Sequence, residues 1–201
     1  MLIVFEGIDG AGKNTQIRRL LRFLKGHGVP YSLHKYPTKE ANEAFDYLAE
    51  KKSVPQLKLA KIFADDIMVH QAELEKDLAE GKVVICDRYL HSTLAYQAVA
   101  DGFMRLKKIL LKRHALCPDL VLLLDIPAEL GSKRKTKQKT PDRHEKDIAY
   151  LAKVRKNYLR MAKDNFLSYK YAVVDANAPK GKVFSDIITQ IEPIIVRELE
   201  K

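Results

Sequence analysis

Apolar runs of the kind that form buried strands alternate along the chain with segments of helical periodicity. Strands are expected at 2–5, 31–35, 82–86, 120–124 and 171–174. Most of these runs are apolar on both faces, which is typical of a parallel sheet covered by helices on each side. Helices are expected at 15–21, 56–79, 90–98, 103–115, 145–163 and 183–199. The pattern therefore predicts an α/β fold with a parallel sheet.

Three of the expected strands end in an aspartate: Asp87, Asp125 and Asp175. In an open parallel sheet, ligands bind beyond the carboxyl ends of the strands. We therefore expect these three carboxylates to lie along the ligand-binding edge of the sheet.

Residues 132–143 interrupt the alternation. The segment is strongly basic, contains no apolar residue and includes Pro141. Because it has no face to bury, it is predicted to be a mobile surface excursion between two helices. An ordinary solvated charge run is the simpler interpretation of the same residues.

Composition narrows the classes of protein that fit. The chain has 201 residues, 46% of them hydrophobic, enough for one compact domain with a sizeable core. Its formal charge of +10 favours anionic partners such as nucleotides or nucleic acid. No apolar stretch is long enough to span a membrane, and the sequence shows no secretory signal. Its two cysteines, Cys86 and Cys117, form no disulfide framework and no metal-ligand spacing. We expect a cytoplasmic protein.

The first strand runs into a glycine-rich loop of the phosphate-binding type. Its residues are Gly7, Ile8, Asp9, Gly10, Ala11, Gly12, Lys13, Asn14 and Thr15. Such a loop, between a strand and a helix, directs backbone N–H groups toward an anion at the positive end of the helix dipole. Lys13 would add a charge for the β- and γ-phosphates. Asn14 stands where a Ser or Thr hydroxyl usually serves magnesium.

Asp87-Arg88-Tyr89 follows the strand at 82–86 and should face the same crevice. Asp87 would hold magnesium through water, and the planar guanidinium of Arg88 would clamp the phosphate of an acceptor. A strand-end salt bridge between Asp87 and a neighbouring base is the alternative.

Together with Ser92, Ala95-Tyr96-Gln97 and Asp142-Arg143-His144-Glu145, these motifs resemble the thymidylate kinase family, in order along the whole chain. The resemblance implies a three-layer P-loop kinase fold with a five-stranded parallel sheet. It implies transfer of the γ-phosphate of ATP to dTMP with Mg2+, in dTTP synthesis. It also implies a homodimer with no membrane or nucleic-acid partner, built from a single kinase domain at 1–201 with a lid at 132–145.

The resemblance also assigns roles to individual residues. Catalysis would involve Asp9, Lys13, Arg88 and Arg143, and ATP would contact the loop from Gly7 to Thr15 and Arg134, which would lie over the adenine. The acceptor would be bound by Asp9, Lys39, Phe63, Arg88, Tyr96 and Gln97. Phe63 would stack on the base, and Tyr96 would exclude a ribose 2′-hydroxyl. Asp87 and Asn14 would serve the metal. Without the resemblance, Phe63 is an ordinary core aromatic and Asp9 a turn-former.

Members of the family carry a catalytic arginine either in the phosphate loop or in the lid. Here Gly10 and Ala11 bring no charge to the loop. The resemblance therefore directs attention to the lid residues Arg134, Lys137, Lys139 and Arg143, of which Lys139 and Arg143 flank the turn at 140–142.

Three positions depart from the family pattern: Asn14, Lys39 in place of an arginine, and Ile67 in place of an arginine that reads the base. An aliphatic side chain cannot donate a hydrogen bond to thymine. A pyrimidine monophosphate kinase with relaxed base preference, acting on dUMP, is therefore one alternative. A nucleotide- or nucleic-acid-binding protein without turnover is the other, since the chain is basic.

Overall fold

The computed structural model describes residues 1–136 and 147–199, and within them a five-stranded, all-parallel sheet. Its strands are β1 (Leu2–Glu6), β2 (Tyr31–Lys35), β3 (Val83–Asp87), β4 (Leu120–Asp125) and β5 (Tyr171–Asp175), in the order β2-β3-β1-β4-β5. The predicted parallel α/β fold is confirmed.

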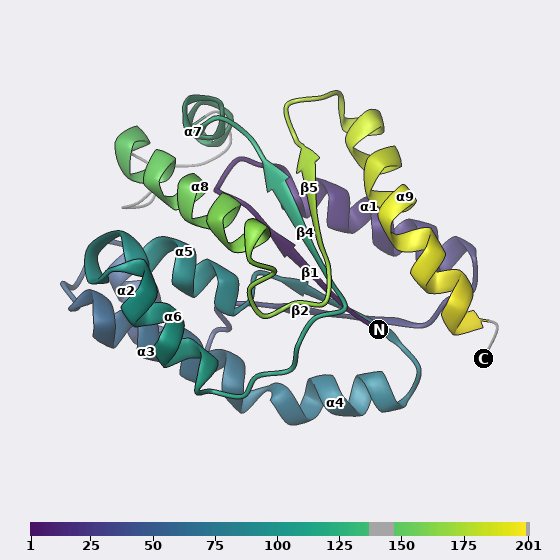
Figure 1. The fold of residues 1–201 in the computed structure, drawn as a ribbon, viewed down its shortest axis with the longest axis horizontal. Helices are drawn as coiled ribbons and strands as arrows, with labels where there is room; N and C mark the ends of the chain where they lie inside the picture. The colour runs from purple at the N-terminus through teal and green to yellow at the C-terminus, as the bar shows by residue number, and fades with distance from the viewer. Residues whose placement is uncertain (137–146, 200–201) are drawn as a thin grey trace.

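Helices cover both faces of this sheet and make it the middle of three layers (Figure 1). α1 and α9 pack together on one side, and α5 and α8 on the other, with α3 and α6 against the outside of α5. The helices are α1 (Lys13–Gly26), α2 (Asn42–Leu48), α3 (Gln56–Val69), α4 (Gln71–Ala79), α5 (Leu90–Asp101), α6 (Phe103–Leu111), α7 (Ala128–Thr136), α8 (Ile148–Lys163) and α9 (Lys180–Leu199).

Burial follows the position of each strand in the sheet. β1 and β3 are buried at every position, as expected for central strands with helices on both faces. β5 is an edge strand in which buried and more exposed residues alternate, and Val173 is 51% exposed. Unlike the central strands, this run is therefore not buried on both faces, because only one face of the edge strand is fully covered.

The helices differ from the predicted ones in three places. The single helix expected at 56–79 is two helices, α3 and α4, separated at His70. α2 was not predicted at all. The basic excursion expected from Ser132 is helical as far as Thr136, because α7 continues into it. Residues 137–146, which hold most of the expected lid, lie outside the described residues.

The strand order places a ligand crevice beside β1. β1 lies between β3 and β4, and Phe5 is in register with Asp87. The chain leaves these neighbouring strands at the same edge of the sheet, on either side of the point where the strand order reverses. Ligands bind at this position in open α/β sheets. Among the described helices, none is both long and apolar enough to cross a membrane.

Candidate active site

The phosphate loop follows β1 and depends on glycine at its tightest points. Gly7, Gly10 and Gly12 all have positive φ, of 137°, 80° and 93°. A Cβ on Gly7 would collide with the carbonyl of Leu124, and one on Gly10 with the carbonyl of Gly131 in α7. The loop is thus packed backbone to backbone against β4 and α7, which only glycine permits.

Lys13, the first residue of α1, folds back over this loop. Its ammonium donates to the carbonyl oxygens of Gly7, at 2.9 Å, and Ile8, at 3.3 Å. Burial, with the nearby Arg88 charge, lowers the pKa of Lys13 to about 8. The lysine is therefore held beside the anion-binding loop, where its hydrogen-bond partners among the described residues are neutral carbonyl oxygens. A bound phosphate would stabilise its charged form.

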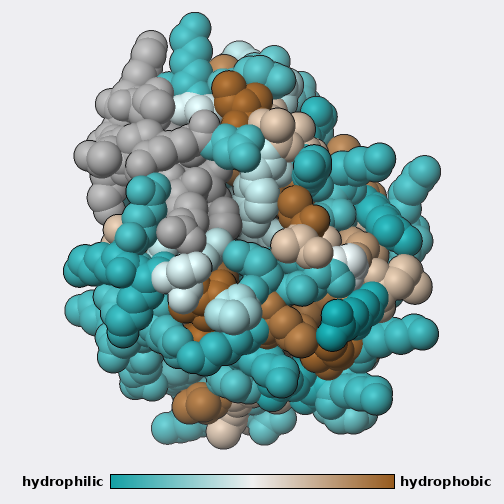
Figure 2. Space-filling model, turned by 90° about the vertical axis from the view of Figure 1, so that its left-hand side faces the viewer, coloured by the Kyte–Doolittle hydropathy of each residue, from teal (hydrophilic) through white to brown (hydrophobic). Residues whose placement is uncertain are grey.

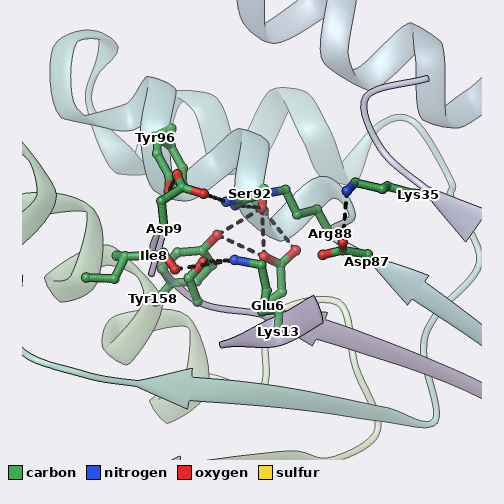
Figure 3. Close-up of polar contacts among 11 residues, drawn as sticks. Glu6, Ile8, Asp9, Lys13, Lys35, Asp87, Arg88, Ser92, Tyr96 and Tyr158 are labelled. Atoms are coloured by element: carbon green, nitrogen blue, oxygen red, sulfur yellow. Dashed lines mark hydrogen bonds and ion pairs between the residues drawn. The ribbon is translucent and has the colours of Figure 1, made fainter. Parts of the chain in front are cut away.

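Asp87 ends β3 next to the loop (Figure 3). Its Oδ2 lies 3.6 Å from the ammonium of Lys35, an exposed lysine at the end of β2. Its Oδ1 is buried and has no hydrogen-bond partner among the described residues. The strand-end salt bridge therefore exists, but it leaves one carboxylate oxygen unused. Asn14 is exposed on the first turn of α1.

Arg88 follows Asp87 and points across the crevice to Asp9 in the phosphate loop (Figure 3). The two side chains form an ion pair of 2.7 Å, and the hydroxyl of Tyr96 donates to the other oxygen of Asp9 at 2.8 Å. The guanidinium carbon of Arg88 also lies 5.3 Å from the centre of the Tyr96 ring. Arg88 itself has a φ of 73°, a costly backbone conformation for a non-glycine residue.

Beside this ion pair lies a cavity that is open to solvent. Its polar wall holds the Asp9–Arg88 pair, and its apolar wall comes from α3, the end of α2 and the loop after β2. On the face that carries α2, α3 and α8, hydrophobic side chains lie open among hydrophilic ones (Figure 2). The lining residues are Asp9, Tyr36, Pro37, Leu48, Phe63, Ile67, Arg88, Tyr89, Ser92, Thr93, Tyr96 and Gln97.

Comparison with known proteins identifies the kind of site. A family model described as thymidylate kinase matches residues 5–187. A probable thymidylate kinase of Thermococcus onnurineus is 36% identical over 203 residues, which cover 96% of this chain and 97% of that protein. The chain belongs to the thymidylate kinase family. A probable thymidylate kinase of Methanocaldococcus jannaschii is 35% identical, with 96% and 97% covered, and a thymidylate kinase of Chromobacterium violaceum is 32% identical, with 97% and 95% covered.

Membership in the thymidylate kinase family makes the protein a phosphotransferase of the nucleoside monophosphate kinase type. The relatives named above span almost the same length as this chain. The alternative of a nucleic-acid-binding protein without turnover has no support in them.

The residues predicted for the acceptor mostly come together in this thymidylate kinase fold. Asp9, Phe63, Arg88, Tyr96 and Gln97 all line the one cavity, although they come from the phosphate loop, α3, the end of β3 and α5. Lys39 is exposed and does not line it. Ile67, the departure from the family pattern, is buried and forms part of the apolar wall.

Of the four basic lid candidates of the thymidylate kinase family pattern, Arg134, Lys137, Lys139 and Arg143, only Arg134 lies within the described residues. Its Nη1 donates to the carbonyl of Ala176, just after β5, at 3.0 Å. This contact joins α7 to the loop that precedes α9. Lys137, Lys139 and Arg143 lie outside the described residues.

Sequence reasoning assigned no role to several residues around the site, among them Leu48, Thr93, Glu6 and Tyr158. Leu48 and Thr93 line the cavity, while Glu6 and Tyr158 are buried behind Arg88. Glu6 had a visible signal, since a carboxylate inside an otherwise apolar strand needs partners. Tyr158 had none, because helical periodicity predicts only a core position for it.

Proposed function

We propose that the protein transfers the γ-phosphate of ATP to dTMP, with magnesium, and releases ADP and dTDP in the route to dTTP. The observation that carries this proposal is the juxtaposition of Arg88 and Asp9. The arginine lies between a phosphate loop on one side and a solvent-open cavity with an apolar wall on the other. An acceptor phosphate bound there would face the terminal phosphate of the donor.

On the donor side, the chain supplies backbone N–H groups and one movable charge. The ammonium of Lys13 would exchange its contacts to Gly7 and Ile8 for oxygens of the β- and γ-phosphates. Transfer then needs alignment and charge neutralisation rather than a covalent intermediate.

On the acceptor side, the guanidinium of Arg88 would hold the phosphate with its planar pair of N–H groups. The phosphate would replace part of the contact that Asp9 now makes, leaving that carboxylate to Tyr96 and the sugar. Tyr96 is buried, and Asp9 fixes its hydroxyl at the edge of the cavity. A ribose 2′-hydroxyl would have to compete with this ring for space.

The base would lie between Phe63 and the amide of Gln97. Gln97 is buried, and its Oε1 has no hydrogen-bond partner within the described part of the chain. An unpaired buried amide is costly, and a ligand that pairs with it removes the cost. The imide edge of thymine offers both an N–H donor and a carbonyl acceptor to such an amide.

The residues also fit magnesium. The unpaired Oδ1 of Asp87 is the kind of oxygen that Mg2+ accepts directly or through water, with Asn14 as the second predicted contact. When bound, the ion would neutralise charge on the phosphates of the donor.

We further propose that the lid at 132–145 belongs to a single kinase domain spanning the chain and that Arg143 supplies its catalytic charge, with Arg134 near the adenine. The homodimer and the cytoplasmic location that the family resemblance implies are retained as proposals. Light scattering on the purified protein tests the dimer.

A coupled assay of ADP release over dTMP, dUMP, CMP and UMP tests the main proposal. We expect dTMP to be the best acceptor, and equal rates with all four would refute the assignment. Arg143→Ala should lower kcat more than it raises KM, because a lid charge acts mainly in the transition state.

A relaxed preference that includes dUMP is the second candidate, and Ile67 is the observation that favours it. The residue forms part of the cavity wall and offers no hydrogen bond to a base carbonyl. Comparing kcat/KM for dTMP and dUMP in the wild type and in Ile67→Arg measures how much position 67 contributes to discrimination between the two acceptors.

A further inference from the structure

Glu6 is a fully buried carboxylate in the middle of the molecule. It ends β1, directly before the phosphate loop, and none of its surface is exposed. A charge in such a place is expensive unless hydrogen bonds satisfy it. Glu6 does not line the cavity, so contact with a substrate does not explain its burial.

The two oxygens of Glu6 accept from two different sets of donors. Oε1 accepts from the backbone N–H groups of Tyr89, at 2.8 Å, and Ser92, at 3.1 Å. Oε2 accepts from the hydroxyls of Ser92, at 2.7 Å, and Tyr158, at 2.8 Å. Burial raises the pKa of Glu6, while the Arg88 charge and the two hydroxyl donors oppose that rise.

The Oε1 of Glu6, at the end of β1, caps the N-terminus of helix α5. α5 begins at Leu90, and no side chain of its own N-cap residue, Tyr89, accepts from its first turn. Helices leave their first N–H groups without internal partners. Glu6 accepts from the Tyr89 N–H and is a second acceptor for the Ser92 N–H, which also donates to the Tyr89 carbonyl at 3.0 Å. The backbone N–H of Arg88 donates to the carbonyl of Phe5, also in β1, at 3.0 Å. These contacts hold the turn in which Arg88 adopts its positive φ.

The Oε2 contacts continue to the guanidinium itself. Nη1 of Arg88 donates to the Ser92 hydroxyl oxygen at 2.9 Å. Since arginine can only donate, the Ser92 hydroxyl accepts from it and donates its own hydrogen to Glu6 at 2.7 Å, with the Tyr158 hydroxyl 2.9 Å away. The chain of hydrogen bonds thus runs from Arg88 through Ser92 to Glu6, while Nη2 of Arg88 faces Asp9 (Figure 3).

We propose that Glu6 is a positioning residue for acceptor binding: it fixes both the backbone turn and, through Ser92, the guanidinium orientation of Arg88. This inference rests on the proposed function, in which Arg88 binds the acceptor phosphate. Glu6 itself touches no substrate. Its loss should therefore weaken dTMP binding selectively and leave ATP binding to the phosphate loop.

Glu6→Gln separates the two contacts. A glutamine carbonyl can still accept from the Tyr89 and Ser92 N–H groups, so the helix cap survives. Its amide group replaces Oε2, where it would donate toward Ser92 and Tyr158 and face the Arg88 cation. We expect KM and Kd for dTMP to rise about tenfold, the loss typical of a charge-assisted hydrogen bond, with KM for ATP within about twofold of the wild type.

Val4→Ala is the matched control, since Val4 is equally buried on β1 and carries no polar side-chain atom. It should lower Tm without a selective effect on dTMP. If Glu6→Gln behaves like Val4→Ala, or raises the KM of both nucleotides in proportion, the positioning role is refuted.

Ser92→Ala removes the bridge and keeps Glu6. We expect a selective loss of dTMP affinity here too, and a double variant with Glu6→Gln no worse than Glu6→Gln alone, because both act through one hydrogen-bond chain. If the losses of dTMP affinity in the two single variants add up in the double variant, the hydrogen-bond chain from Arg88 through Ser92 to Glu6 is refuted. If Glu6→Gln fails to fold, an unchanged dTMP affinity in Ser92→Ala refutes the inference by itself.

The two proposals fail in different ways. A wild-type protein that neither binds nor phosphorylates dTMP refutes the proposed function. A wild type that does both, with variants whose dTMP affinity is unchanged, refutes only the role of Glu6. Calorimetric titration with dTMP in the absence of ATP supplies the affinity independently of turnover.

Discussion

The donor side and the acceptor side of the site are constructed in different ways. The donor side is one continuous stretch, in which backbone N–H groups and Lys13 surround the anion site. The acceptor side gathers side chains from β3, α3, α5 and the loop after β1 around one cavity. A site formed by the backbone tolerates little variation at its glycines, whereas a site formed by side chains can change its preference one residue at a time. We propose Ile67 as a position of this kind.

The largest expected effect is a loss of turnover from a substitution on the donor side alone. Lys13→Ala removes the only side-chain charge of the phosphate loop that can follow the transferred phosphate. We expect kcat to fall about 100- to 1,000-fold, the usual loss for one transition-state donor. Steady-state kinetics should show dTMP affinity nearly unchanged. Lys25→Ala, an exposed lysine on the same helix, is the control, and an equal loss there would contradict this role.

Arg88→Lys should weaken binding on the acceptor side. Lysine keeps the charge but cannot span Asp9, Ser92 and a phosphate with one planar group. We expect KM for dTMP to rise on the order of a hundredfold, since two charge-assisted hydrogen bonds change. KM for ATP should stay close to that of the wild type. Arg105→Lys, on the exposed surface of α6, should have no effect.

Phe63→Ala sharpens the comparison at the base end of the cavity. Loss of a stacking ring should weaken dTMP binding about tenfold and leave ATP binding unchanged. Phe45→Ala, at a 42% exposed position on α2 outside the cavity lining, is the control. Equal losses for both nucleotides in Phe63→Ala, with a lower Tm, would mark this residue as core rather than as a binding residue.

The smallest effect concerns the proton on Lys13. With a pKa of about 8 in the free protein, Lys13 is mostly neutral at about pH 8.5. Phosphates favour the charged form, so ATP binding should take up part of one proton at that pH. Calorimetry in buffers of different ionisation enthalpy measures the uptake. Lys13→Arg, which stays charged, should abolish it, and uptake that persists there would come from another group.

The same contrast explains what the sequence could predict. The phosphate loop is local, so its residues, their spacing and the adjoining strand and helix identify it together. Asp87 and Arg88 were also recognisable, because they follow a buried strand directly. The parallel sheet followed from the apolar runs. These features depend on residues that are neighbours in the chain.

The remainder depends on residues far apart in sequence. Glu6 meets Ser92 and Tyr158 across separations of 86 and 152 residues, and no pattern within one element reveals such a contact. The break between α3 and α4 falls at His70, where no glycine or proline predicts the end of a helix. α2 is too short for its periodicity to be distinctive, yet it contributes Leu48 to the cavity.

The packing of Gly10 against Gly131 has a consequence for how the catalytic charge can be moved. A side chain at position 10 would collide with the backbone of α7, and Ala11 is already buried. An arginine introduced at position 10 would have to displace this backbone before it reached a phosphate, and one at position 11 would have to leave a buried site. A charged side chain cannot therefore be added at position 10 by a single substitution, because the backbone of α7 would have to move together with the loop.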